Sequence, residues 1–170
     1  DPKGPAMTWS VFAIGWMNVK NYSQAAALFQ RGYRNNVNPP FNVWSEAPHG
    51  GDTINFITGA GGFLQSALFG ALGMRVHGPL ELSFDPPPPS VTGVDGVISM
   101  GADSVNFCGG WRVSVDVTRE SINFEVVEAS PAGGALELAV AKGKAVTRLD
   151  ERGATATAAR GKATLRCVPK

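Results

Sequence analysis

Charged residues are scarce in this chain of 170 residues. Asp, Glu, Lys and Arg make up 17% of it, against roughly 25% in an ordinary globular domain. Hydrophobic residues make up 44%, which is enough to build a core and excludes disorder along the whole length. No apolar run reaches the roughly 18 residues of a membrane-spanning helix. We therefore expect no membrane partner.

Cysteine and histidine are scarcer still, with two residues of each. Two cysteines are too few for a disulfide scaffold, and Cys108 and Cys167 are compatible with one bridge or with free thiols. His49 and His77 lie on different predicted elements, and neither cysteine has another ligand at close spacing. The sequence therefore predicts neither a metal site nor any other cofactor.

Helical periodicity marks the first part of the chain. In residues 7–20 the apolar residues stand at helical spacing and predict one buried helix face: Trp9, Phe12, Ala13, Trp16 and Met17. A second helix is predicted over residues 22–34, capped by Asn21 or Ser23 and ended by Asn35–Asn36. The segment 63–72 is apolar nearly all round, as in a helix buried on every side. Three helices cannot surround one of themselves, so we expect partner structure outside this set.

From residue 76 onward the hydrophobic period changes to two. Apolar residues alternate with polar or small ones in four runs: Leu80–Phe84, Trp111–Val117, Ile122–Val126 and Leu136–Val140. Gly- and Pro-rich turns separate the runs, and we expect roughly eight short strands. The predicted fold class is α+β, with residues 1–75 helical and residues 76–170 forming an antiparallel, jelly-roll-like β-sandwich.

The net charge of +1 hides a basic C-terminal segment. Residues 142–170 hold eight Lys or Arg against Asp150 and Glu151. These charges are spaced among Ala, Thr and Gly with no aromatic partners, a pattern that favours a solvated strand face over a nucleic-acid site. We expect no nucleic-acid partner.

Two small motifs suggest chemistry that their surroundings do not support. The run Gly59–Gly62 lacks the third glycine of a dinucleotide fingerprint and the Lys-Ser/Thr ending of a phosphate loop, so close packing at a helix start is the preferred interpretation. Ser45, His49 and Asp52 include the three residue types of a hydrolase triad. Nothing resembling a nucleophile elbow surrounds Ser45, and this interpretation is set aside.

Glu46 is the strongest catalytic candidate. It follows Trp44 in a loop between two apolar helices and precedes a Pro-His-Gly-Gly turn. Sugar sites combine an aromatic face, which stacks on the pyranose ring, with a carboxylate that transfers protons. Asp52 is either its partner carboxylate or a helix-start residue. From composition alone, a solvated surface Glu is the commoner meaning of such a residue.

Four ordered blocks of sequence resemble a known family. They are GPAMTWS at residues 4–10, FAIGWM at 12–17, VWSE at 43–46 and NFITGAGGFLQ at 55–65. Read together, they resemble the C-terminal part of glycoside hydrolase family 65, over about residues 4–85 and more loosely up to about residue 129. Several blocks in order are much more specific than any single motif.

This resemblance implies an inverting α-glucosidase. The helices would be the last of an (α/α)₆ barrel, and Glu46 would be the general base that activates water. The substrate would be the glucosyl-galactosyl unit on hydroxylysine of collagen, or a trehalose-like disaccharide. Trp44, Asn55 and Thr8 would contact sugar, and the setting would be cytosolic. The family's general acid lies upstream, so the remainder of the barrel is the expected partner and the isolated chain is expected to be inactive.

Three other interpretations remain open at this stage. In the first, the chain is a non-catalytic carbohydrate-binding or structural piece that docks on another chain. In the second, it belongs to a family phosphorylase with a phosphate site near Thr8 and Ser10. The third is a decayed copy without function. Regular alternation through the strands disfavours decay, and a packing role for Trp44 competes evenly with sugar binding.

Overall fold

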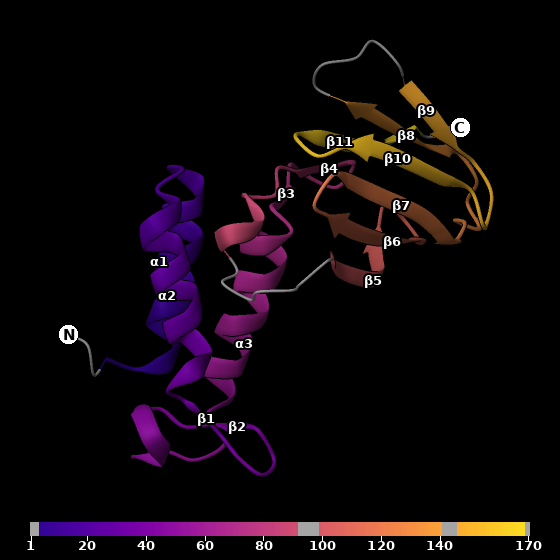
Figure 1. The fold of residues 1–170 in the computed structure, drawn as a ribbon. Coiled ribbons are helices and arrows are strands. Elements are labelled where there is room, and N and C mark those ends of the chain that lie inside the picture. The colour runs from indigo at the N-terminus through magenta and orange to yellow at the C-terminus, as the bar shows by residue number, and fades with distance from the viewer. Residues whose placement is uncertain (1–3, 92–98, 141–145, 169–170) are drawn as a thin grey trace. The chain divides into compact units, whose positions relative to one another are not determined.

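The computed structural model describes residues 4–91, 99–140 and 146–168. The chain forms two compact units. The helical unit comprises residues 1–71 and 87–96, and the β unit comprises residues 72–86 and 97–170. Figure 1 follows the chain from the helices to the strands.

Three main helices build the helical unit. They are α1 (Ala6–Asn18), α2 (Tyr22–Arg34) and α3 (Ile57–Gln65), and α3 continues as the π-helical turn η2 (Ser66–Ala71). Short 3₁₀ turns lie at η1 (Pro48–Gly50) and η3 (Pro89–Val91). The helices expected over residues 7–20 and 22–34 are confirmed, and Asn21 caps α2 by accepting a hydrogen bond from Gln24 N at 3.3 Å. No helix in the described ranges is long and apolar enough to cross a membrane.

The buried face of α1 differs from the predicted one. Trp9, Ala13 and Met17 are buried as expected, but the side chains of Phe12 and Trp16 are 56% and 39% exposed. The neighbouring helices approach α1 where side chains are small. A Cβ added at Gly32 of α2 would stand 2.9 Å from Ser10 Oγ. Close helix approach at Ser10 therefore sets the orientation of α1, which keeps Trp9 and Met17 buried and leaves Phe12 and Trp16 largely outside.

The composition of the segment 63–72 predicts a helix that is buried on every side, but in the structure one side of this segment is exposed. Leu64 is 61% exposed, and Ile57 at the start of α3 is 82% exposed. The buried side of α3 and η2 consists of small residues: Gly59, Gly62, Ser66, Gly70 and Ala71. An apolar composition reports what a helix can bury, whereas the available neighbours decide what it does bury.

Two antiparallel sheets build the β unit. One has the strand order β10-β7-β6-β5 and the other β3-β4-β11-β8-β9. The strands of the first sheet are β5 (Ser99–Phe107), β6 (Trp111–Thr118), β7 (Ser121–Glu128) and β10 (Thr155–Ala159). Those of the second are β3 (Met74–Val76), β4 (Glu81–Phe84), β8 (Ala135–Val140), β9 (Val146–Leu149) and β11 (Ala163–Val168). This arrangement fits the expected α+β class with a β-sandwich.

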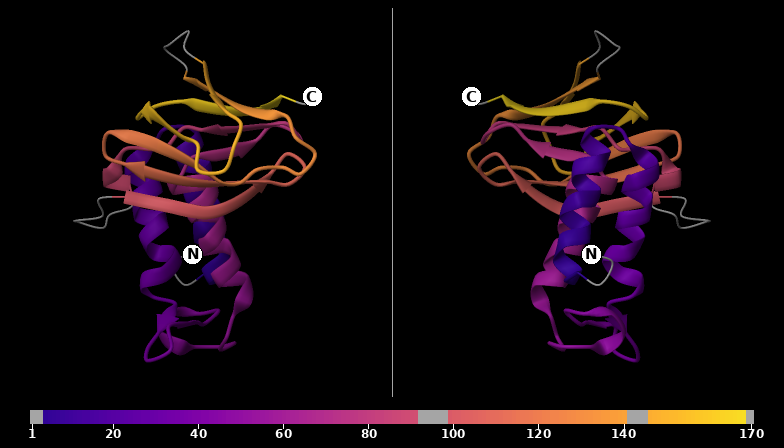
Figure 2. Two further views of the ribbon diagram at one scale, coloured as in Figure 1. Left: turned by 90° about the vertical axis from the view of Figure 1, so that its right-hand side faces the viewer. Right: turned by 90° about the vertical axis from the view of Figure 1, so that its left-hand side faces the viewer.

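The core of the β unit lies between these sheets, which Figure 2 shows stacked. The rings of Phe84 from β4 and Phe124 from β7 meet edge to face, with centroids 5.3 Å apart. In β6 every second residue from Trp111 is buried, as alternation predicts. Cys108, which follows β5, is disulfide-bonded to Cys167 of β11, a pairing that the sequence alone left open.

Candidate functional site

The loop between α2 and α3 carries the catalytic candidate and has an unusual backbone. It contains a hairpin of two short strands, β1 (Val37–Asn38) and β2 (Val43–Trp44). Four of its non-glycine residues have positive φ, between 54° and 60°: Asn42, His49, Asp52 and Asn55. Such conformations cost energy, persist only where surrounding contacts enforce them, and gather at functional sites.

The backbone of Glu46 is held from three directions. Its carbonyl accepts hydrogen bonds from Ala6 N at 3.0 Å and from Asn36 Nδ2 at 3.1 Å, and its own N–H donates to Thr53 O at 3.0 Å. The first contact comes from the start of α1, the second from the end of α2 and the third from the approach to α3. The position of Glu46 is therefore set by the helical unit and not by its own loop alone.

The side chain of Glu46 is partly accessible. The residue is half-buried, and among the described residues its carboxylate takes part in no hydrogen bond or ion pair. A carboxylate on a fixed backbone, with no polar partner in the part of the chain that the structure describes, can accept a proton from a bound water molecule. The arrangement is therefore suited to general base chemistry.

Asn36 is the structural residue of this site that sequence reasoning missed. It is fully buried, and its amide nitrogen donates to Ser45 O at 3.2 Å as well as to Glu46 O. The sequence interpretation used Asn36 only as a helix stop. The alternation of Asn36 and Asn38 just after α2 was the available signal, because the Asn38 amide also donates into this loop, to Ser45 Oγ at 3.0 Å.

Trp44, in β2 of the loop, packs against the helices. Its ring packs on that of Phe63, with centroids 5.5 Å apart, and its indole N–H donates to Gly32 O at 3.2 Å. Phe63 also contacts Phe29 and Tyr33 of α2. The indole is half-buried, so part of its surface is left for another contact. Its role in binding sugar stays a prediction.

Thr8 and Asn55 lie at the same end of the helical unit as Glu46. Thr8 is in the first turn of α1, two residues after Ala6, and its hydroxyl donates to Pro5 O at 2.9 Å. Asn55 is exposed and directly precedes Phe56, whose N–H donates to Trp44 O at 2.7 Å. Ala6 and Phe56, which are near Thr8 and Asn55 in sequence, hydrogen-bond to the Trp44–Glu46 segment, so Thr8 and Asn55 belong to the same end of the helical unit as that segment. Their roles toward a sugar stay predictions.

The two rejected motifs have structural roles. Ser45 is fully buried and its hydroxyl donates to Ala47 O at 2.6 Å, which removes it as a nucleophile. The run Gly59–Gly62 lies inside α3 and not in a phosphate-binding loop. A Cβ at Gly59 would meet Trp44 Cδ1 at 2.9 Å, so this glycine serves close packing. Asp52 is exposed and precedes Thr53, whose carbonyl accepts from Glu46 N.

Comparison with curated proteins finds similarity to glucosidases. The chain is 39% identical to the protein-glucosylgalactosylhydroxylysine glucosidase of Mus musculus over 125 residues, which are 74% of this chain and 17% of the mouse protein. It is 46% identical to the Danio rerio protein of the same name over 104 residues, 59% of this chain and 16% of that protein. A kojibiose hydrolase of Flavobacterium johnsoniae is 40% identical over 72 residues, 42% of this chain and 10% of the hydrolase.

No family model and no solved structure matches this chain. The chain spans about a sixth of the length of the mouse and zebrafish relatives. The resemblance noted from the four sequence blocks is confirmed by relatives that are themselves named as glucosidases. By similarity over 74% of its residues, the chain is a relative of the protein-glucosylgalactosylhydroxylysine glucosidases and corresponds to one part of those longer glycoside hydrolases.

Proposed function

We propose that this chain supplies the general base of an inverting α-glucosidase, and that Glu46 is that base. The observation that carries the proposal is the arrangement at Glu46, where α1, Asn36 and Thr53 fix the backbone while the carboxylate stays unengaged among the described residues. The similarity to named glucosidases supplies the reaction class.

The chemistry needs two carboxyl groups. The Glu46 carboxylate removes a proton from a water molecule as the water oxygen attacks the anomeric carbon on the face opposite the leaving group. A carboxylic acid protonates the departing glycosidic oxygen at the same time. In inverting enzymes the two groups stand about 6.5–9.5 Å apart, which leaves room for the water. Glucose is released with inverted configuration.

The general acid is proposed to lie outside this chain. We propose that the three helices are the last of an (α/α)₆ barrel and that the remainder of this barrel supplies the acid and most of the glucose-binding wall. General acid or base assistance is typically worth about 10²–10⁴-fold in rate. The isolated chain is therefore expected to have no useful glucosidase activity.

The proposed substrate is an α-glucoside whose glucose is terminal. The mouse and zebrafish relatives are named for the glucosyl-galactosyl-hydroxylysine unit, and the bacterial relative for kojibiose. Either substrate would place a glucose ring beside Glu46, with Thr8, Trp44 and Asn55 as proposed contacts. The exposed part of the Trp44 indole would stack on the apolar face of a sugar ring.

The test combines this chain with the part of a longer glucosidase that is proposed to supply the general acid. The chain is produced together with a mouse glucosidase from which the segment similar to it has been deleted, and glucose release from glucosyl-galactosyl-hydroxylysine and from kojibiose is measured. We expect activity from the pair, none from either part alone, and a loss of about 10²-fold or more with Glu46→Gln. Glu125→Gln, an exposed Glu of the β unit, is the matched control and should leave activity unchanged. Activity that survives Glu46→Gln in the pair contradicts the assignment.

A non-catalytic role is the second candidate, because the chain covers only about a sixth of its glucosidase relatives. In that role the chain binds carbohydrate or braces another chain without taking part in bond cleavage. An inactive pair in which the two parts are nevertheless bound to each other would favour this candidate over the enzyme.

A further inference from the structure

The turn between α1 and α2 contains a sequence motif that the proposed function does not use. Asn21, Tyr22 and Ser23 form the pattern Asn-X-Ser/Thr with X other than proline, which is the acceptor sequence for N-linked glycans. It is the only tripeptide of this form in the 170 residues. Because such tripeptides also arise by chance, the place of Asn21 in the fold and the state of the cysteines decide what it means.

Asn21 lies at a turn where the fold leaves room for a bulky group. Residues 18–21, which connect the two helices, are all exposed, and Ser23 is exposed as well. The backbone N–H of Asn21 donates to Trp16 O at 3.0 Å, which ties the turn to the end of α1. A glycan is large and hydrophilic and needs an acceptor at the surface. The surroundings of Asn21 meet this requirement.

The side chain of Asn21 can carry a sugar and still cap α2. Its Oδ1 accepts the hydrogen bond from Gln24 N at 3.3 Å, whereas its Nδ2 has no hydrogen-bond partner among the described residues. An N-linked glycan is attached to the amide nitrogen, and the amide keeps its carbonyl oxygen as an acceptor. Glycosylation of Asn21 therefore removes neither the helix cap nor any other contact in the described ranges.

The cysteines indicate the compartment in which this modification takes place. Cys108 and Cys167 are the two cysteines of the sequence, and they are bonded to each other. They are 59 residues apart and join the end of β5 in one sheet to β11 in the other, which is the arrangement of a structural bridge and not of a closely spaced redox pair. Structural disulfides persist in secreted proteins and in the endoplasmic reticulum and are rare in the cytosol. The bond thus favours the secretory route over the cytosolic setting that the family resemblance implies.

We propose that Asn21 is an N-glycosylation site and that this chain passes through an oxidising secretory compartment. The donor is an oligosaccharide joined through a diphosphate to a lipid. Asn21 Nδ2 forms a bond to the anomeric carbon of the first sugar, the bond from that carbon to the diphosphate oxygen breaks, and the lipid diphosphate leaves. The amide gives up one proton, and nothing is oxidised or reduced.

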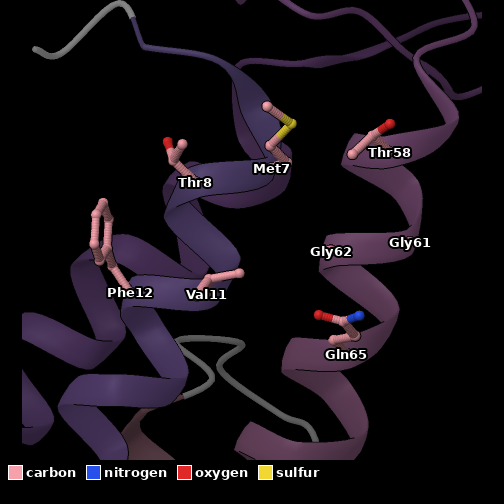
Figure 3. Close-up of a pocket in the computed structure, with 8 residues that line it drawn as sticks. All are labelled: Met7, Thr8, Val11, Phe12, Thr58, Gly61, Gly62 and Gln65. Atoms are coloured by element: carbon pink, nitrogen blue, oxygen red, sulfur yellow. The ribbon is translucent and has the colours of Figure 1, made fainter.

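The proposed glycan is remote from the candidate catalytic residue. The carbonyl of Glu46 is bonded to the first residue of α1, and Asn21 follows the end of this helix, whose 13 residues span about 20 Å. Figure 1 shows the β1–β2 hairpin and the α1–α2 turn at opposite ends of the helices. A groove of about 460 Å³ between α1 and α3 is lined from the first half of α1, by Met7, Thr8 and Val11 among others (Figure 3). The sugar chain therefore begins at the end of the helices away from the candidate site.

The test locates the modification on the protein from its natural source. Enzymatic removal of an N-glycan converts the glycosylated Asn into Asp, and mass spectrometry of the peptides should then find Asp at position 21 in most molecules. An untreated sample should lack the unmodified Asn21 peptide to the same extent. An Asn21 that is unmodified in the natural protein overturns the proposal and leaves the proposed chemistry of Glu46 untouched.

Two changes at Ser23 separate the modification from folding. Ser23→Ala removes the acceptor pattern but leaves the Asn21 cap in place, so the chain should fold and lose the glycan completely. Ser23→Thr keeps the pattern and is the matched control, which should retain the glycan. Both variants are expressed in cells of the natural source, and gel mobility with and without enzymatic deglycosylation measures the glycan. A glycan that persists in Ser23→Ala, or one that is absent from Ser23→Thr, contradicts the assignment to Asn21.

Discussion

At Asn36 one side-chain amide holds the backbone of two consecutive residues. Its nitrogen donates to the carbonyl oxygens of Ser45 and Glu46, and the residue is fully buried. A buried amide that bonds two carbonyls needs two N–H groups, which Asn offers and Asp lacks. The position of the catalytic candidate thus depends on a residue that has no catalytic chemistry of its own.

Asn36→Asp is predicted to destabilise the helical unit strongly. The change replaces the donating nitrogen with a carboxylate oxygen that faces two carbonyl oxygens inside the protein. We expect the free energy of unfolding to fall by about 3 kcal/mol, measured by urea denaturation. Asn42→Asp is the matched control, because Asn42 is exposed and Asp tolerates its positive φ nearly as well. Equal effects of the two variants would rule out this role for the Asn36 amide.

Glu46→Gln is predicted to leave stability nearly unchanged. The contacts that position Glu46 use its backbone N–H and carbonyl, and its carboxylate binds no other described residue. A substitution of this kind should change the free energy of unfolding by about 0.5 kcal/mol or less. Thermal unfolding of the isolated chain measures it. A large loss of stability would show that the carboxylate has a structural partner and would weaken its assignment as a free base.

At the scale of helices and strands, periodicity predicted where elements lie better than which side they bury. The helices over residues 7–20 and 22–34 and the strands around Trp111 and Ile122 follow from spacing alone. The exposure of Phe12 does not, because it depends on which face of α1 its neighbours approach, and that is decided by glycines on other helices. The anchoring of Glu46 by Asn36 spans ten residues, across a hairpin whose two-residue strands are too short for a period to be recognised.

Two glycines of α3 form a matched pair for testing helix packing. Gly61→Ala should raise the free energy of unfolding by about 1 kcal/mol, because alanine is the better helix former and the new methyl meets nothing within 4 Å. Gly59→Ala should lower it by about 1–3 kcal/mol, because its methyl would come within 3.0 Å of both Trp44 and Ala6. Chemical denaturation of both variants measures the difference. The same sign of change for both would contradict the packing described for α3.

At the scale of the whole molecule, the disulfide is predicted to stabilise one unit and not the other. The bond between Cys108 and Cys167 closes a loop with a sequence separation of 59. The chain-entropy estimate for a loop of that length is about 4 kcal/mol. Reduction, or the double change Cys108→Ser and Cys167→Ser, should lower the melting temperature of the β unit and leave that of the helical unit unchanged. Calorimetry with and without reductant measures this, and a uniform shift of both transitions would contradict it.

The disulfide between Cys108 and Cys167 also determines what happens to the protein when its main chain is cut between these residues. Arg152 lies between the two cysteines in sequence and is exposed, just before β10. A protease that cuts after Arg152 separates the last two strands from the rest of the main chain, yet Cys167 still ties that peptide to Cys108. The cleaved protein remains one covalently linked molecule, and the hydrolysed peptide bond adds the mass of one water molecule. Strand pairing also holds the piece in the folded protein, and once the protein is unfolded only a reductant releases it, so the β unit is covalently a ring with two tails and not a line.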